Sequence, residues 1–170
     1  MISKTPDCLI LHMQRSIFHP TGRVLKNNCS VQYDEYLDMS PFSHGLQSGF
    51  FYGTKDASEA MGWKGSTEFS MHESESSEDD TARYPYLYKL QAVVLHYGSH
   101  DSGHFVTLRR IASKSEQFAD NWYGISDSSV ILVENIQSEV YRYGQDYVYL
   151  LFYQRVKDIT FKEAQKFIMK

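Results

Sequence analysis

Three histidines stand four residues apart in the stretch HYGSHDSGHFVTLRR: His96, His100 and His104. On a helix this spacing would align the imidazoles on one face, where they could bind zinc. Two glycines and the polar residues between them instead indicate a loop that joins two strands, so the spacing carries no geometric meaning. We therefore expect neither a metal site nor a cofactor.

Acid–base chemistry is the second possibility, because an imidazole with a pKa near ~6.5 exchanges protons at neutral pH. His104 is the best placed of the three histidines, since it follows a glycine-rich loop and opens a strand-like stretch. The next strand-like stretch ends in Ser126 and Asp127, and a hairpin would bring that end beside His104. Either residue could hold one ring nitrogen and leave the other free.

A serine hydrolase that uses Ser102 or Ser126 is disfavoured, because the chain lacks the G-x-S-x-G turn that exposes such a nucleophile. A purely structural histidine beside a polar residue is the plain alternative to a catalytic one. The residues by themselves leave both readings of His104 open.

The elements that must position these residues are mainly strands. The 170 residues include 13 tyrosines and 10 phenylalanines, and aromatic side chains favour sheets. Alternating apolar residues joined by short turns predict an antiparallel sheet, with a buried first strand and a hairpin-like opening of forty residues. The expected strands are residues 8–13, a second strand that begins at Val24 after the TGR turn, and residues 84–98, 104–111, 121–127, 128–135 and 145–156.

The remaining segments are expected to be an insertion and a helix. Residues 43–83 show no sustained period and carry five carboxylates between Glu73 and Asp80, so a mobile surface loop is expected. Residues 157–170 predict a short amphipathic helix with Asp158 as a possible N-cap. The expected fold class is α+β.

Composition also limits the partners and the compartment. The formal charge of −4 and the short apolar runs argue against nucleic acid as a partner and against a transmembrane segment in this chain. A reducing, cytoplasmic location is expected, with Cys8 and Cys29 as small buried hydrophobic residues rather than as a disulfide.

Several ordered motifs resemble one protease family. The stretches YKLQAVVLHYGSHDSGHFVTLRR, WYGISDSSV and QDYVYLLFYQR resemble the histidine box and closing strands of the ubiquitin-specific proteases, which are papain-like cysteine proteases. The stretch PDCLILHMQRSIFHPTGRVLKNNCSVQYDEYLDM is similar to the segment before that box. The resemblance implies a palm-like, mostly antiparallel sheet, with residues 1–156 as the C-terminal part of a catalytic domain.

The resemblance also implies roles for individual residues. His104 would be the general base, and Ser126 or Asp127 the residue that orients it. This Ser-Asp order resembles a mitochondria-associated branch of the family, whereas most members carry Asn or Asp at the first position. His96, Gly103 and Phe105 would bind the substrate, beside a loop that moves to admit the Gly-Gly tail of ubiquitin.

The implied function is hydrolysis of isopeptide or peptide bonds at the C-terminal glycine of ubiquitin. The partners would be ubiquitin, ubiquitinated proteins and the N-terminal part of the same catalytic domain. Nothing in the chain resembles the family's cysteine box, so we expect this chain alone to be an inactive fragment. The alternative is a non-catalytic ubiquitin-binding or scaffold remnant. Association with the mitochondrial outer membrane would need a segment that is not present here.

Overall fold

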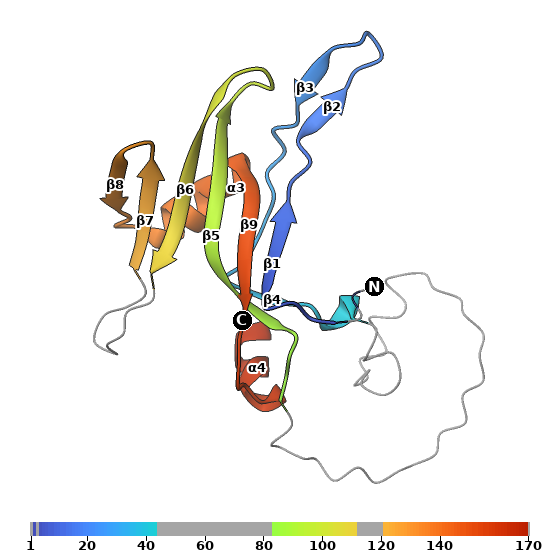
Figure 1. Cartoon of the computed structure of the whole chain (residues 1–170), viewed down its shortest axis with the longest axis vertical. Helices are drawn as coiled ribbons and strands as arrows, with labels where there is room; N and C mark the ends of the chain where they lie inside the picture. The colour runs from blue at the N-terminus through green and yellow to red at the C-terminus, as the bar shows by residue number, and fades with distance from the viewer. Residues whose placement is uncertain (1, 3, 44–82, 112–120, 170) are drawn as a thin grey trace, which may run out of the picture.

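The computed structural model describes residues 2, 4–43, 83–111 and 121–169, and this part of the chain is built around one antiparallel sheet (Figure 1). Its strands follow the spatial order β1-β9-β5-β6-β7-β8, with β4 added beside β5. Strands β2 and β3 form a separate ribbon. This arrangement confirms the expected antiparallel α+β fold. The strands are β1 (Cys8–His12), β2 (Ser16–Phe18), β3 (Val24–Lys26), β4 (Tyr36–Asp38), β5 (Leu87–Gly98), β6 (Gly103–Ile111), β7 (Asn121–Ser126), β8 (Ser129–Leu132) and β9 (Val148–Arg155).

The core lies on one face of the sheet, and alternation along the strands creates it. Successive side chains of a strand point to opposite faces, so every second residue can be buried. Val93 and Leu95 of β5, Leu108 of β6 and Trp122 of β7 are nearly inaccessible to solvent and belong to one cluster. Each such aliphatic or aromatic side chain contributes roughly 1.5–3 kcal/mol to the free energy of folding.

A helical segment between β8 and β9 lies against this face, as Figure 1 shows behind β5 and β6. It consists of α2 (Ile136–Ser138), the π-helical turn η3 (Glu139–Tyr143) and α3 (Gly144–Tyr147). Val140 is fully buried in the core cluster, and its carbonyl accepts a 2.5 Å hydrogen bond from the Tyr33 hydroxyl. The sequence did not predict this segment, and its last part occupies residues expected to begin the closing strand.

Strand β1 is an edge strand rather than the expected buried strand. It pairs only with β9 among the described strands, and Cys8, Ile10 and His12 are exposed on its outer face. The apolar run that suggested burial therefore contributes Leu9, Leu11 and Met13 to the packed side, and each of the three is only partly buried. Side chains of a strand alternate between the two faces of the sheet, and the outer face of β1 is exposed, so every second side chain of this strand meets solvent.

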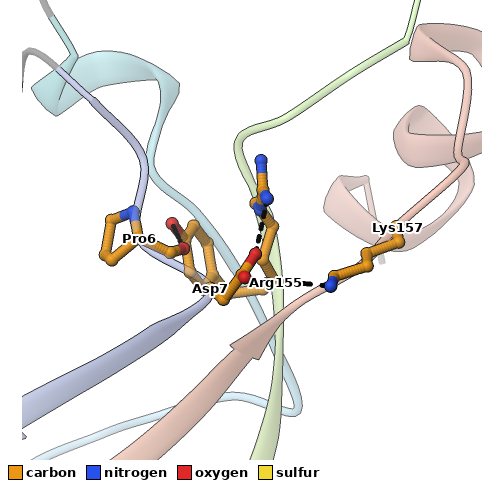
Figure 2. A network of polar contacts seen from close by, with 5 residues as sticks. Pro6, Asp7, Arg155 and Lys157 are labelled. Atoms are coloured by element: carbon orange, nitrogen blue, oxygen red, sulfur yellow. Dashed lines mark hydrogen bonds and ion pairs between the residues drawn. The ribbon is translucent and has the colours of Figure 1, made fainter.

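Polar contacts hold the start of β1 against the end of β9 (Figure 2). The Asp7 carboxylate accepts a 2.5 Å hydrogen bond from the Arg155 guanidinium and lies 3.8 Å from Lys157 Nζ. The Asp7 carbonyl also accepts from the Arg155 amide at 2.9 Å. Hydrogen bonding to Arg155 and the charges of Arg155 and Lys157 lower the pKa of the Asp7 carboxyl. The Tyr88 hydroxyl also donates to the Pro6 carbonyl at 2.7 Å.

Both cysteines are exposed and free, which corrects the expectation that they are buried. Cys8 lies on the outer face of the edge strand, and Cys29 lies in the connection after β3. The small side chains of Cys8 and Cys29 are not buried, because neither residue faces the core.

The C-terminal helix α4 (Phe161–Ile168) is shorter than the predicted 157–170 and is capped by Thr160 rather than by Asp158. The Thr160 hydroxyl accepts from the Glu163 amide, and the Glu163 carboxylate accepts from the Thr160 amide, so two otherwise unpaired amides are satisfied. Asp158 instead adopts a positive φ of 56° and pairs with Arg83 at 3.2 Å. The helix packs its apolar side on β4, where the Phe167 and Tyr36 ring centroids are 4.5 Å apart.

The predicted mobile insertion 43–83 lies outside the described residues except at its two ends. Ser43 forms a bridge with Ile2, and Arg83 forms a bridge with Thr160. Within the described ranges, no helix is long and apolar enough to cross a membrane.

Candidate active site

The β5–β6 hairpin presents His104 at the end of the sheet. Tyr97 pairs with His104 and Gly98 with Gly103, and a turn of four residues joins the two strands. The Ser99 amide closes that turn by donating to the Ser102 carbonyl at 2.8 Å. His104 is therefore the second residue of β6, on a rigid strand beside a tight turn.

Both glycines of the hairpin are required by the backbone. Gly98 has a φ of 102°, and a Cβ there would meet the Ser102 carbonyl oxygen at 2.6 Å. A Cβ on Gly103 would collide with His96 Nε2 and with the Tyr97 carbonyl oxygen. A side chain at either position would force the strands apart, which places these glycines under a steric constraint independent of any substrate.

Strand β7 brings Ser126 to His104. Thr107 pairs with Ile125, so the last residue of β7 lies beside the beginning of β6. His104 Nε2 lies 2.6 Å from Ser126 Oγ. Asp127 is the next residue, in the turn to β8 with a positive φ of 51°, and within the described residues it forms no hydrogen bond with His104.

The contact between His104 and Ser126 leaves one ring nitrogen available. In the tautomer in which Nε2–H donates its hydrogen bond to Ser126 Oγ, the neutral imidazole carries its lone pair on Nδ1. No hydrogen bond of the described residues occupies Nδ1. A neutral imidazole held in this way has the form that a general base requires.

The predicted substrate-binding residues meet on the opposite face of the same hairpin. The rings of His96 and Phe105 stack with centroids 4.5 Å apart and an interplanar angle of 25°, and Tyr149 lies 5.5 Å from Phe105. Phe105 is 51% exposed. Burial, and secondarily the nearby Lys26 cation, lowers the pKa of His96. His104 and Phe105 are consecutive in β6, so their side chains point to different faces.

A cleft of about 300 Å³ separates the hairpin from the β2–β3 ribbon. His96, Gly103 and Phe105 line its hairpin side, and Arg15 and Lys26 line its ribbon side. The structure therefore brings together the three predicted substrate-binding residues in one cleft, and the predicted base with Ser126 on the other face.

Sequence reasoning missed Arg15, Lys26 and Tyr149. Arg15 is 6% exposed and donates to the carbonyls of Val148 at 2.6 Å and Asn27 at 2.8 Å. Its only sequence signal is a basic residue two positions after the expected strand 8–13. Lys26 and Tyr149 carried no signal, because their partners in the cleft are distant in the chain.

The cysteines and the histidines do not form a metal or thiol centre in the described residues. No group of three His, Cys, Asp or Glu side chains in that part of the chain could hold a metal ion. No hydrogen bond there joins His104 to Cys8 or Cys29. Neither cysteine lies at a helix N-terminus, a setting that lowers the pKa of a thiol.

Comparison with known sequences supports one family. The family model described as ubiquitin carboxyl-terminal hydrolase matches residues 1–153. Ubiquitin carboxyl-terminal hydrolase 30 of Xenopus tropicalis is 31% identical over 182 residues, covering 92% of this chain and 34% of that protein. The Rattus norvegicus protein of the same name is 29% identical over 197 residues, covering 91% and 37%. The chain thus spans about a third of the length of these relatives.

Solved structures share the fold. A chain of the yeast SAGA DUB module superposes with a TM-score of 0.57 at 20% identity, covering 89% of this chain and 25% of that chain. A SAGA DUB module bound to monoubiquitin gives a TM-score of 0.56 at 21% identity, covering 89% and 24%. At this level of identity the likeness establishes the architecture of the sheet.

Proposed function

Because the chain belongs to the ubiquitin carboxyl-terminal hydrolase family, we propose that it supplies the general base of a cysteine-type deubiquitinase. The reaction is hydrolysis of isopeptide or peptide bonds at the C-terminal glycine of ubiquitin. The observation that carries this proposal is the 2.6 Å contact of His104 Nε2 with Ser126 Oγ at the end of two paired strands.

His104 acts in both steps of the proposed mechanism, the formation of the thioester and its hydrolysis. Its Nδ1 takes the proton of a thiol, and the thiolate attacks the carbonyl carbon of the terminal glycine. The imidazolium then returns the proton to the leaving amine. A water molecule, deprotonated by the same nitrogen, hydrolyses the thioester and releases the carboxylate. Ser126 keeps the ring oriented but, as a neutral residue, adds no charge to stabilise the imidazolium.

The cleft beside the hairpin is the proposed site for the part of the ubiquitin tail that leads to the terminal glycine, because the carbonyl of that glycine must itself lie near His104 on the other face. His96, Phe105 and Tyr149 provide aromatic walls, and Gly103 presents backbone without a side chain. A site that leaves no room for side chains beside the tail would admit Gly-Gly and reject residues with larger side chains. Ubiquitin and ubiquitinated proteins are thus the proposed partners.

The nucleophile is proposed to come from the N-terminal part of the same catalytic domain. Cys8 and Cys29 are exposed but have no hydrogen bond to His104 in the described residues. This chain alone is accordingly proposed to be inactive. The cytoplasmic location expected from the sequence stays a prediction.

The decisive experiment uses ubiquitin with a C-terminal electrophile that forms a stable bond with a nucleophilic cysteine. Incubated with the complete native protein, the probe should form an adduct at a cysteine other than Cys8 or Cys29, as mapped by mass spectrometry. This chain alone should remain unmodified. A complete protein that binds ubiquitin without forming an adduct would favour the alternative, a non-catalytic ubiquitin-binding remnant. Modification of Cys8 or Cys29 would refute our placement of the nucleophile.

A further inference from the structure

The last residues of β5 lack a strand neighbour on one side. Strand β5 pairs with β9 up to Leu95 opposite Val148, whereas its pairing with β6 continues to Gly98 opposite Gly103. In the described part of the chain, residues 96–98 therefore have β6 on one side and no strand on the other. Backbone carbonyls at such a place need another hydrogen-bond donor.

Lys26 of β3 supplies this donor. Its Nζ donates to the His96 carbonyl at 2.6 Å and to the Gly98 carbonyl at 3.0 Å. Carbonyls of alternate strand residues point the same way, so one ammonium group reaches both. The residue between them is Tyr97, which pairs with His104. Lys26 thus binds β5 on both sides of Tyr97, the residue that pairs with the proposed base His104.

Lys26 is itself held in place at the root of the ribbon. It pairs with Ser16, and the Asn27 amide after it donates to the Arg15 carbonyl at 2.6 Å. The Arg15 guanidinium binds the carbonyls of Asn27 and Val148, the residue where β9 begins. A continuous series of contacts therefore runs from β9 through Arg15 and Lys26 to the hairpin.

We propose that Lys26 is a positioning residue for the deubiquitination reaction, because it anchors the end of β5 to the β2–β3 ribbon and so fixes His104 and the neighbouring cleft wall. This inference rests on the proposed function. Lys26 does not touch the reacting atoms and acts through the hairpin. Figure 1 shows the ribbon as a separate arm beside the β5–β6 tip.

A positioning role for Lys26 depends on its hydrogen-bond donors, whereas a packing role would depend only on its apolar stem, so substitutions can distinguish the two. Burial, and secondarily the nearby Arg15 cation, lowers the pKa of Lys26, which agrees with an ammonium group partly covered between the ribbon and the hairpin. An arginine at this position keeps the charge and several donors, although its fork differs in geometry. A methionine keeps the length and apolar stem but cannot donate to either carbonyl.

The test compares Lys26→Met and Lys26→Arg in the complete native protein, with Lys166→Met on the exposed side of α4 as the matched control. Cleavage of a fluorophore from the C-terminus of ubiquitin gives kcat and KM, and hydrogen exchange of a peptide spanning residues 96–105 reports on the hairpin. Thermal melting shows whether each variant folds. The expected result for Lys26→Met is a kcat lower by about 10- to 100-fold, with KM changed less than about threefold.

The same variant should exchange its hairpin amides faster, whereas Lys26→Arg should recover much of the kcat and Lys166→Met should match wild type. A folded Lys26→Met protein with wild-type kcat would overturn the inference, as would a lower kcat without faster exchange of the hairpin. If the wild-type protein shows no turnover, the proposed function is overturned. The role of Lys26 in the reaction is then overturned as well. The hydrogen exchange would then still show whether Lys26 anchors the hairpin.

Discussion

Ser126 and Asp127 are neighbours in the chain but occupy different positions relative to His104. Ser126 ends β7 beside the imidazole, whereas Asp127 turns away into the connection to β8. A carboxylate would stabilise an imidazolium better than a hydroxyl, yet only Ser126 is within hydrogen-bond distance. Geometry therefore favours Ser126 as the orienting residue.

Substitution of these two residues should separate their roles. In the complete protein, Ser126→Ala should lower kcat by about 10- to 100-fold, because the ring loses its only described hydrogen-bond partner. Asp127→Asn should leave kcat within about threefold, since Asn tolerates the positive φ at this position. Steady-state kinetics with a fluorogenic ubiquitin substrate measure both. The reverse order of effects would assign the orienting role to Asp127.

The sequence predicted this site only in part. His104 and Ser126 could be brought together because each lies at the boundary of a strand with clear alternation, and a hairpin joins such strands. Lys26 could not be found in the same way. Its carbonyl partners are 70 and 72 residues away, and no local pattern encodes a contact between a ribbon and a distant hairpin.

At the scale of elements, the hairpin turn determines where His104 lies. Gly98 combines a positive φ with close contact to the Ser102 carbonyl, whereas Gly22 in the β2–β3 turn has a φ of 81° and open space around it. Both glycines therefore adopt a positive φ, but only Gly98 lacks the space for a Cβ.

Alanine substitution at these glycines should show that difference. Gly22→Ala should lower the free energy of unfolding by about 1–2 kcal/mol through the positive φ alone. Gly98→Ala should cost about 1–3 kcal/mol more, because the new Cβ displaces the turn. Urea unfolding of the two variants provides the comparison. Equal losses of stability would show that the turn accommodates a Cβ by a small local shift.

Element prediction succeeded where periodicity was long and failed where it was short. Strands β6 and β7 agree with the expected positions to within a residue, because each is a strand-like run bounded by turn formers. Strand β8 covers only Ser129–Leu132 of the expected 128–135, and all four of its residues are exposed. The segment Ile136–Tyr147 is divided into helical pieces of three to five residues, too short to show a helical period. The position of β9 between β1 and β5 could not be predicted from the sequence either, because strand order depends on contacts between distant residues.

At the scale of the whole molecule, the core contains several tyrosines that must remain neutral. Burial raises the pKa of Tyr33, Tyr84 and Tyr153, and it raises the pKa of Tyr141 to about 12. The Tyr33 and Tyr153 hydroxyls donate to the Val140 and Asp34 carbonyls, contacts that require the phenol proton. The folded state therefore favours the protonated phenol.

This burial predicts alkaline unfolding. The folded-state pKa values lie above the ordinary value of 10, so the stability they contribute is complete below pH 10 and is lost as the pH rises towards 12 and beyond. Phenolate absorbance and far-ultraviolet circular dichroism, followed together from pH 8 upwards, should show a late group of tyrosines that ionises as the sheet unfolds. Ionisation of every tyrosine near pH 10 with the sheet intact would contradict the packing of this core.

The central claim is that His104 is the general base, and its substitution tests that claim most directly. We would measure kcat/KM of the complete native protein and of its His104→Ala variant on fluorogenic ubiquitin, with His19→Ala in the β2–β3 turn as the control. The expected loss for His104→Ala is at least about 100-fold, with thermal melting and ubiquitin affinity unchanged because the residue is exposed. A folded His104→Ala protein with kcat/KM within about threefold of wild type would remove this histidine from the mechanism.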